Sequence, residues 1–193
     1  MPTERPILFN GAMVRALLDG TKTQTRRIVK APKGFTVGTM TSGGVVEMIS
    51  VKPDGNPWDV IRCPYGVPGD RLWVRETFRY ERCPAGAAVR YRADNHLREL
   101  GEPVRRDTVP NGRWRPSIHM FRCDSRITLE VTDVRVERVQ DITWEDVEAE
   151  GTEGADSAAF ADLWDSINAK RGYGWEANPW VWVVEFNAID LVG

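Results

Sequence analysis

The segment from Ile127 to Val136 carries the pattern that most restricts the fold. Apolar and polar residues alternate through Ile127–Val131 and again through Val134–Val136, but the two runs differ in phase by one residue. Alternation of this kind is typical of a strand with one buried face. A bulge at Thr132-Asp133 would restore the phase, and bulges bend and twist the strand that contains them. The sequence therefore predicts a strongly curved sheet.

Further patterns predict six to eight short strands and three helices. Strands are expected at 7–9, in a hairpin over 35–51 with its tip at 41–44, at 71–78, at 89–92 and at 180–186. Helices are expected over 11–18, over 143–150 behind a capping box that opens at Thr143, and over 160–167, where apolar residues recur at helical spacing. These elements indicate an α+β, mainly β fold: a small curved barrel with two or three helices flanking a cleft.

The 193 residues are expected to form a single domain, 1–193, with an irregular region inserted at about 80–125. This insertion is locally basic. Its arginines are Arg90, Arg92, Arg98, Arg105, Arg106, Arg113 and Arg115. Two interpretations stay open: a solvated charged loop, or a flap that contacts nucleic acid.

Composition restricts the partners. The net charge of −2 argues against a general duplex binder, although it allows a local basic pocket. No apolar run is long enough to cross a bilayer, and the N-terminus lacks an apolar signal core, so a cytoplasmic protein without a membrane partner is expected. The three cysteines form no CxxC pair, which favours reduced thiols over a disulfide framework or a zinc site with His96 and His119. We expect no metal and no cofactor.

The stretch from Asp19 to Arg27 is dense in hydrogen-bond donors. It holds one lysine, two arginines, three threonines and a glutamine, and it follows the 11–18 helix after Gly20, a residue typical of helix C-termini. Such a stretch suits a site for an anionic or acceptor-rich ligand. The structural alternative is that Lys22, Thr25 and Arg27 cap the helix and bridge to Glu76 or Glu185.

Three segments in this order resemble an ASCH domain, a branch of the PUA-like β-barrel superfamily. They are Gly20–Arg27, Pro68–Phe78 and Pro179–Phe186, and the chain is most similar to the larger ASCH proteins of phages and prophages. The resemblance spans nearly the whole chain, and it implies a PUA-like barrel whose cleft is lined by the first segment. It also implies a link to RNA or modified nucleosides; DNA is an open alternative.

The resemblance implies catalytic candidates as well. One compact ASCH branch hydrolyses the acetamide of N4-acetylcytidine with a lysine, a threonine and a glutamate, and another has been linked to RNA cleavage. The lysine and threonine correspond to Lys22 and Thr25; the glutamate corresponds to Glu150, with Glu76 as the alternative. The chain is almost twice as long as the compact enzymes, so its extra sequence could reshape the cleft.

Two chemical assignments stay open. Thr25 could be a nucleophile activated by Lys22, or Lys22 could be the electrophile while Glu150 activates water. Arg27 suits a ribose, phosphate or base carbonyl, and His119 titrates in the range of a general acid or base. The expected substrate-binding residues are Thr23, Arg26, Arg27, Arg75, Trp73, His119 and Trp180. The function predicted is a nucleic-acid or modified-nucleoside binding domain, RNA favoured, with hydrolysis of an N4-acylated cytidine; the alternatives are a non-enzymatic RNA-binding module, an ASCH-type ribonuclease and an interaction protein without a ligand.

Overall fold

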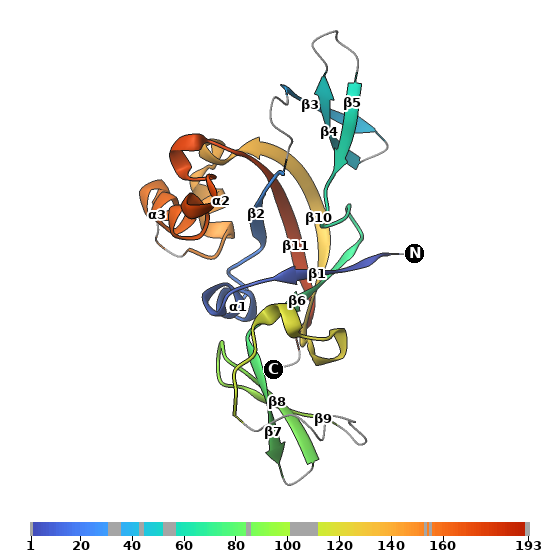
Figure 1. Ribbon diagram of the computed structural model, residues 1–193, viewed down its shortest axis with the longest axis vertical. Helices are drawn as coiled ribbons and strands as arrows, with labels where there is room; N and C mark the ends of the chain where they lie inside the picture. The colour runs from blue at the N-terminus through green and yellow to red at the C-terminus, as the bar shows by residue number, and fades with distance from the viewer. Residues whose placement is uncertain are drawn as a thin grey trace.

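A curved five-stranded sheet organises the computed structural model, which describes residues 2–30, 36–42, 45–51, 57–83, 86–100, 112–152, 154 and 156–191 (Figure 1). Its strand order is β1-β6-β10-β11-β2. The bounds are Glu4–Leu8 for β1, Arg71–Arg75 for β6, Ile127–Arg138 for β10, Trp180–Leu191 for β11 and Gln24–Ile28 for β2. β1 and β6 run parallel, and the other neighbours are antiparallel.

The long hairpin of β10 and β11 sets the curvature of this sheet. Its register shifts between Val131 and Asp133, which leaves Thr132 as an extra residue, and again between Thr128 and Leu129. The bulge predicted at Thr132-Asp133 is confirmed. The expected barrel is not seen, because no pairing among the described residues joins β1 to β2 and both remain edges of an open sheet. The α+β, mainly β class is confirmed.

The first part of β11, through Phe186, is buried on both of its faces, which explains its nearly continuous apolar run, whereas the last five residues of the strand are exposed. Trp182, Val184 and Phe186 face a core cluster that includes Val14 and Leu17 of α1, Gly11–Leu18. Val181 and Val183 face a second cluster. That cluster receives Val147 from α2, Trp144–Ala149, and Phe160 and Trp164 from α3, Ser157–Asn168. The helices therefore cover the two faces of the strand that pairs with β2.

Local signals placed the helices correctly. Thr143 accepts a hydrogen bond from the backbone N–H of Asp146, whose side chain accepts one from the Thr143 N–H, so the capping box is present. Asn10 caps α1 by accepting a hydrogen bond from the Met13 N–H, and Asp156 caps α3 by accepting one from the Ala159 N–H. Short 3-10 helices complete the connections: η1 Ser117–His119, η2 Arg122–Asp124, η3 Val139–Asp141, η4 Ala169–Arg171 and η5 Trp175–Ala177.

Two three-stranded antiparallel sheets extend from opposite ends of the main sheet (Figure 1). The first contains β3, Thr36–Ser42, β4, Val45–Val51, and β5, Pro57–Arg62, and β3 and β4 form the predicted hairpin. The second contains β7, Phe78–Cys83, β8, Gly86–Tyr91, and β9, Leu97–Leu100.

The second small sheet corrects two expectations. The strand predicted over 71–78 is two strands in different sheets, β6 and β7, separated by Glu76 and Thr77. The insertion at about 80–125 is more regular than expected, because β7–β9 have their own core of Phe78, Tyr80, Val89, Tyr91 and Met120. Arg105 and Arg106 of the predicted flap lie outside the described residues.

Among the described helices, none combines the length and the apolar character that crossing a bilayer requires. Within the described residues, the three cysteines form no disulfide. The same residues contain no group of three or more histidine, cysteine and acidic side chains arranged to hold a metal ion.

Candidate functional site

A buried ion pair joins the donor-rich segment to the end of α2. The Lys22 Nζ donates to Glu150 Oε2 at 2.8 Å and to the Glu150 backbone carbonyl at 2.7 Å. The Lys22 side chain is 0% exposed and that of Glu150 is 7% exposed. Both acceptors belong to one residue, so Lys22 fixes the backbone and the carboxylate of Glu150 at once.

The backbone brings this pair together. After α1 ends, Gly20 takes a positive φ of 75°, and the N–H groups of Thr21 and Lys22 both bond to the Ala16 carbonyl at 2.9 and 3.0 Å. Lys22 then pairs with Glu150 in an isolated antiparallel bridge. The Thr23 N–H extends this contact by donating to the Ala149 carbonyl at 2.9 Å.

Gly151 allows this close approach. Its φ is +80°, and a Cβ at this position would lie 2.7 Å from the Ala16 Cβ and 2.9 Å from the Lys22 Cβ. Real Cβ atoms essentially never come so close to other carbon atoms. Gly151, which directly follows the helix expected over 143–150, therefore allows the C-terminus of α2 to pack against α1 and the Lys22 backbone.

A charge network holds the other end of α2. Arg26 donates to Asp146 Oδ2 at 2.8 Å and to Glu137 Oε2 at 3.1 Å. Arg135 bonds Asp146 Oδ1 at 2.9 Å and Glu137 Oε1 at 2.5 Å, and it also pairs with Glu185. The N-terminal end of the short helix is thus tied to β2 and β10, and its C-terminal end to Lys22 and Thr23 just before β2. These contacts fix the position of Glu150.

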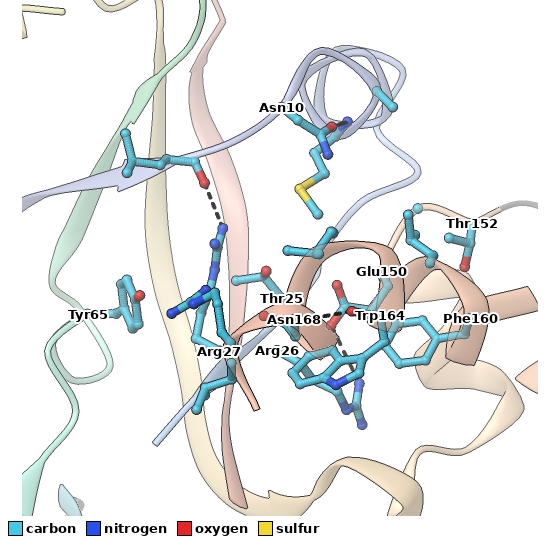
Figure 2. Close-up of a pocket in the computed structure, with 18 of the residues that line it drawn as sticks. Asn10, Thr25, Arg26, Arg27, Tyr65, Glu150, Thr152, Phe160, Trp164 and Asn168 are labelled. Carbon is cyan, nitrogen blue, oxygen red and sulfur yellow. Dashed lines mark hydrogen bonds and ion pairs between the residues drawn. The ribbon is translucent and has the colours of Figure 1, made fainter. Parts of the chain in front are cut away.

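A cavity of about 400 Å³ opens beside Glu150 (Figure 2). The end of β1, α1, β2, Tyr65, the Glu150–Thr152 turn, α3 and η4 contribute to its wall. Thr25, Arg26 and Glu150 form a buried polar part of the lining, at 1%, 5% and 8% exposure. The volume lies within the range of small-molecule sites, about 300–1,000 Å³.

Three atoms of this polar part, one of them Arg26 Nε, have no hydrogen-bond partner among the described residues. Two of the three face each other. They are Arg26 Nη1, a donor, and Glu150 Oε1, an acceptor, and they lie 3.7 Å apart. Buried polar atoms are seldom left unpaired, and an unpaired one needs an explanation such as a water or a ligand. Arg26 Nη1 can donate to a carbonyl oxygen of a ligand, and Glu150 Oε1 can accept from an N–H group of that ligand or from a water molecule.

Burial changes the proton affinity of this region. Desolvation lowers the pKa of Lys22, and the Glu150 carboxylate opposes part of the shift. Desolvation also lowers the pKa of Arg27, which lines the cavity, donates to the Leu8 carbonyl at 2.8 Å and lies over the Phe9 ring at 5.1 Å.

The structure brings Lys22, Thr25, Glu150, Arg26 and Arg27 to one place, and all except Lys22 line the cavity. The ammonium of Lys22 is bound to Glu150 at the edge of the cavity. The alternative bridge from this motif to Glu76 is wrong, and the Glu185 carboxylate instead pairs with Arg135.

The remaining candidates lie outside the cavity lining. Glu76 is buried, and its carboxylate accepts hydrogen bonds from Arg126 Nε at 2.8 Å and Arg126 Nη2 at 3.1 Å. Desolvation raises the pKa of Glu76 against the opposing effect of Arg126. The Arg75 guanidinium stacks on Trp73 at 4.6 Å, and that of Arg138 stacks on Trp180 at 4.2 Å. His119, in η1, and Thr23 are exposed.

Two arginines of the expected flap also have internal partners. Arg90 bonds Glu81 at 2.8 Å, and Arg98 bonds the carbonyls of Cys123 and Ser125 at 2.7 and 3.1 Å. These two side chains support the small sheet of β7–β9 and its connection to β10.

Sequence reasoning missed the contribution of α3. Its apolar stripe was assigned to the core, and Phe160 and Trp164 are indeed buried there. The same stripe forms a wall of the cavity through Phe160, Leu163, Trp164 and Ile167, with Asn168 and Arg171 following. Periodicity identifies a buried face but does not distinguish a core contact from a cavity wall, so no sequence signal separated the two.

Comparisons with known proteins gave no match: no family model, no curated protein and no solved structure is similar to this chain.

Proposed function

We propose that the cavity binds a modified nucleoside and hydrolyses an amide on its base, with an N4-acylated cytidine as the substrate class. The observation that carries this proposal is the Glu150 carboxylate. The buried Lys22 holds one of its oxygens, and the other oxygen accepts no hydrogen bond within the described residues and lies at ion-pair distance, 3.7 Å, from Arg26 Nη1. A nucleoside combines a flat apolar base with a donor and acceptor edge. The cavity offers an apolar wall from α3 and a buried polar end.

Glu150 is the general base in this proposal. Its Oε1 takes a proton from water, and the resulting hydroxide attacks the acyl carbonyl carbon. Arg26 Nη1 donates to the carbonyl oxygen as negative charge develops there. The C–N bond then breaks, and Glu150 returns the proton to the departing N4, which releases the carboxylic acid and cytidine.

Lys22 acts as a positioning residue. Its side chain has no exposed surface, and its Nζ is occupied by two acceptors of Glu150. This geometry favours activation of water by Glu150 over activation of Thr25 by Lys22. Thr25 lies in the cavity wall and supplies a hydroxyl that can bond the base or the water.

The test measures, by chromatography, the release of cytidine from N4-acetylcytidine. Glu150→Gln should reduce kcat by about 10²- to 10⁴-fold, the usual contribution of a general base. Glu148→Gln is the matched control, because Glu148 lies exposed on the same helix and should retain activity. Thermal unfolding of both variants establishes that they are folded.

Thr25 provides the second comparison. Thr25→Ser and Thr25→Val should both retain measurable turnover if water is the nucleophile. Complete loss in Thr25→Val alone, together with an acyl-enzyme detected by mass spectrometry, would reassign the nucleophile to Thr25. The proposal fails if the wild-type protein neither releases cytidine nor binds cytidine or N4-acetylcytidine in calorimetry.

A further inference from the structure

The charges of the cavity are unbalanced, although the chain as a whole has a net charge of −2. Four cationic side chains line it, Arg26, Arg27, Lys30 and Arg171, against a single acid, Glu150. Arg26 is matched by Asp146, Glu137 and, at 3.7 Å, Glu150, and Glu150 is also matched by Lys22. Within the described part of the chain, no carboxylate lies within ion-pair distance of the other three cations.

Unpaired donors accompany these charges. Arg27 donates through Nη2 to the Leu8 carbonyl, but its buried Nε has no hydrogen-bond partner among the described residues. The buried Nε and Nη1 of Arg26 are also without one. Arginine has only donors, so these atoms call for a ligand that supplies acceptors.

The residues that line the cavity differ in burial. Thr25, Arg26 and Glu150 are almost wholly buried, whereas Lys30 and Arg171 are exposed side chains of the same lining. A ligand that fits this order places a hydrogen-bonding, uncharged end inside and an anionic group at the mouth. In a nucleotide, the base and the phosphate are separated in this way by the sugar.

From these observations we infer that the ligand is a mononucleotide, whose phosphate is bound at the mouth by Lys30 and Arg171 while its base reaches Glu150 and Thr25. This inference rests on the proposed function, and it names the substrate class of the same site. Arg27 lies on β2 between the two ends and donates to the sugar or the phosphate.

A single nucleotide fits the mouth better than a polynucleotide does. Binding along a nucleic-acid backbone requires cations that neutralise several successive phosphates. The other residues that α3 contributes near Arg171 include Leu163 and Ile167, which are apolar and 37% and 42% exposed. Partly exposed apolar side chains in the same lining as the two cations suit one phosphate and do not extend the positive surface.

The experiment compares cytidine with cytidine 5′-monophosphate by titration calorimetry on the full chain. The monophosphate should bind about tenfold tighter, which is what two exposed cations contribute against a phosphate at low salt. In the double variant Lys30→Gln/Arg171→Gln, the ratio of the two affinities should fall to about one. Lys170→Gln is the matched control: Lys170 is the exposed neighbour of Arg171 but lies outside the lining, and its removal should leave the ratio near ten.

Three results would overturn the inference. One is equal affinity for cytidine and the monophosphate in the wild-type protein. Another is an equal loss of the ratio in Lys170→Gln, which would show general surface attraction. The third is binding of hexacytidylate more than tenfold tighter than the monophosphate, which would make RNA the ligand.

This binding experiment is separate from the hydrolysis experiment. A phosphate-dependent affinity without cytidine release supports the mononucleotide site and refutes the chemistry. Cytidine release with no effect of the phosphate refutes the mononucleotide and supports the chemistry.

Discussion

Replacement of Lys22 by methionine tests whether the centre of the site is a buried ion pair. The pair is separated by 2.8 Å and both side chains are nearly inaccessible, so its direct Coulomb energy is roughly 6 kcal/mol at an effective dielectric constant of 20. Desolvation of the two ions offsets most of that energy. Removal of one partner leaves the Glu150 carboxylate buried without its counter-ion, and such changes lower the free energy of unfolding by about 3–5 kcal/mol.

A double variant separates the charge from the hydrogen bond to the backbone. In Lys22→Met/Glu150→Gln no charge is left unpaired, and the remaining defect is the Glu150 carbonyl, which loses its donor. An unsatisfied buried carbonyl costs about 1–3 kcal/mol. The double variant should therefore be more stable than Lys22→Met, although it carries one more substitution.

Urea unfolding followed by tryptophan fluorescence measures these differences, since the chain contains eight tryptophans. Lys30→Met is the matched control: Lys30 is an exposed lysine of the same segment, and its loss should change stability by less than about 0.5 kcal/mol. The reasoning is refuted if Lys22→Met costs less than about 1 kcal/mol, or if the double variant is less stable than Lys22→Met.

Three further predictions concern glycine, thiol and cap positions. Gly151→Ala should destabilise the protein by more than 2 kcal/mol in the same unfolding assay, whereas Gly154→Ala, with positive φ but open space around it, should show only the backbone strain of about 1–2 kcal/mol. Burial raises the pKa of Cys63 to about 11 from 9.0, so at pH 8 its alkylation, followed by mass spectrometry, should be roughly 100-fold slower than that of an unshifted thiol, and slower than that of the exposed Cys123. Because the folded protein keeps the Cys63 proton that the unfolded chain releases, this thiol should also make stability fall as pH rises from about 9 to 11. Asp156→Ala removes the cap of α3 and should lower stability by about 1 kcal/mol; an unchanged melting temperature would contradict that role.

The fold was predictable wherever short-range signals decide the structure. The phase break between the two alternating runs of β10 predicted the position of the bulge at Thr132-Asp133. Side chains such as those of Asn10 and Thr143 mark helix starts because they accept a hydrogen bond from the backbone three residues later. Sheet closure and the division of 71–78 were not predictable, because they depend on which distant strands become neighbours. β6 pairs with β10, more than fifty residues later in the chain, whereas β7 belongs to another sheet.

The sequence by itself determined that donors gather between Gly20 and Arg27, and that a glutamate followed by Gly151 ends the second helix. It made Glu150 the first candidate for the acid of the site and Glu76 the alternative, because a carboxylate is the same group at either position. Only the tertiary structure decided which of the two carboxylates meets Lys22. Arg126 donates a hydrogen bond to Glu76 at 2.8 Å, while the bridge between Lys22 and Glu150 brings together residues 128 positions apart. A buried ion pair forms where backbone geometry places both groups, and that geometry arises from the packing of α1, α2 and β2 against one another.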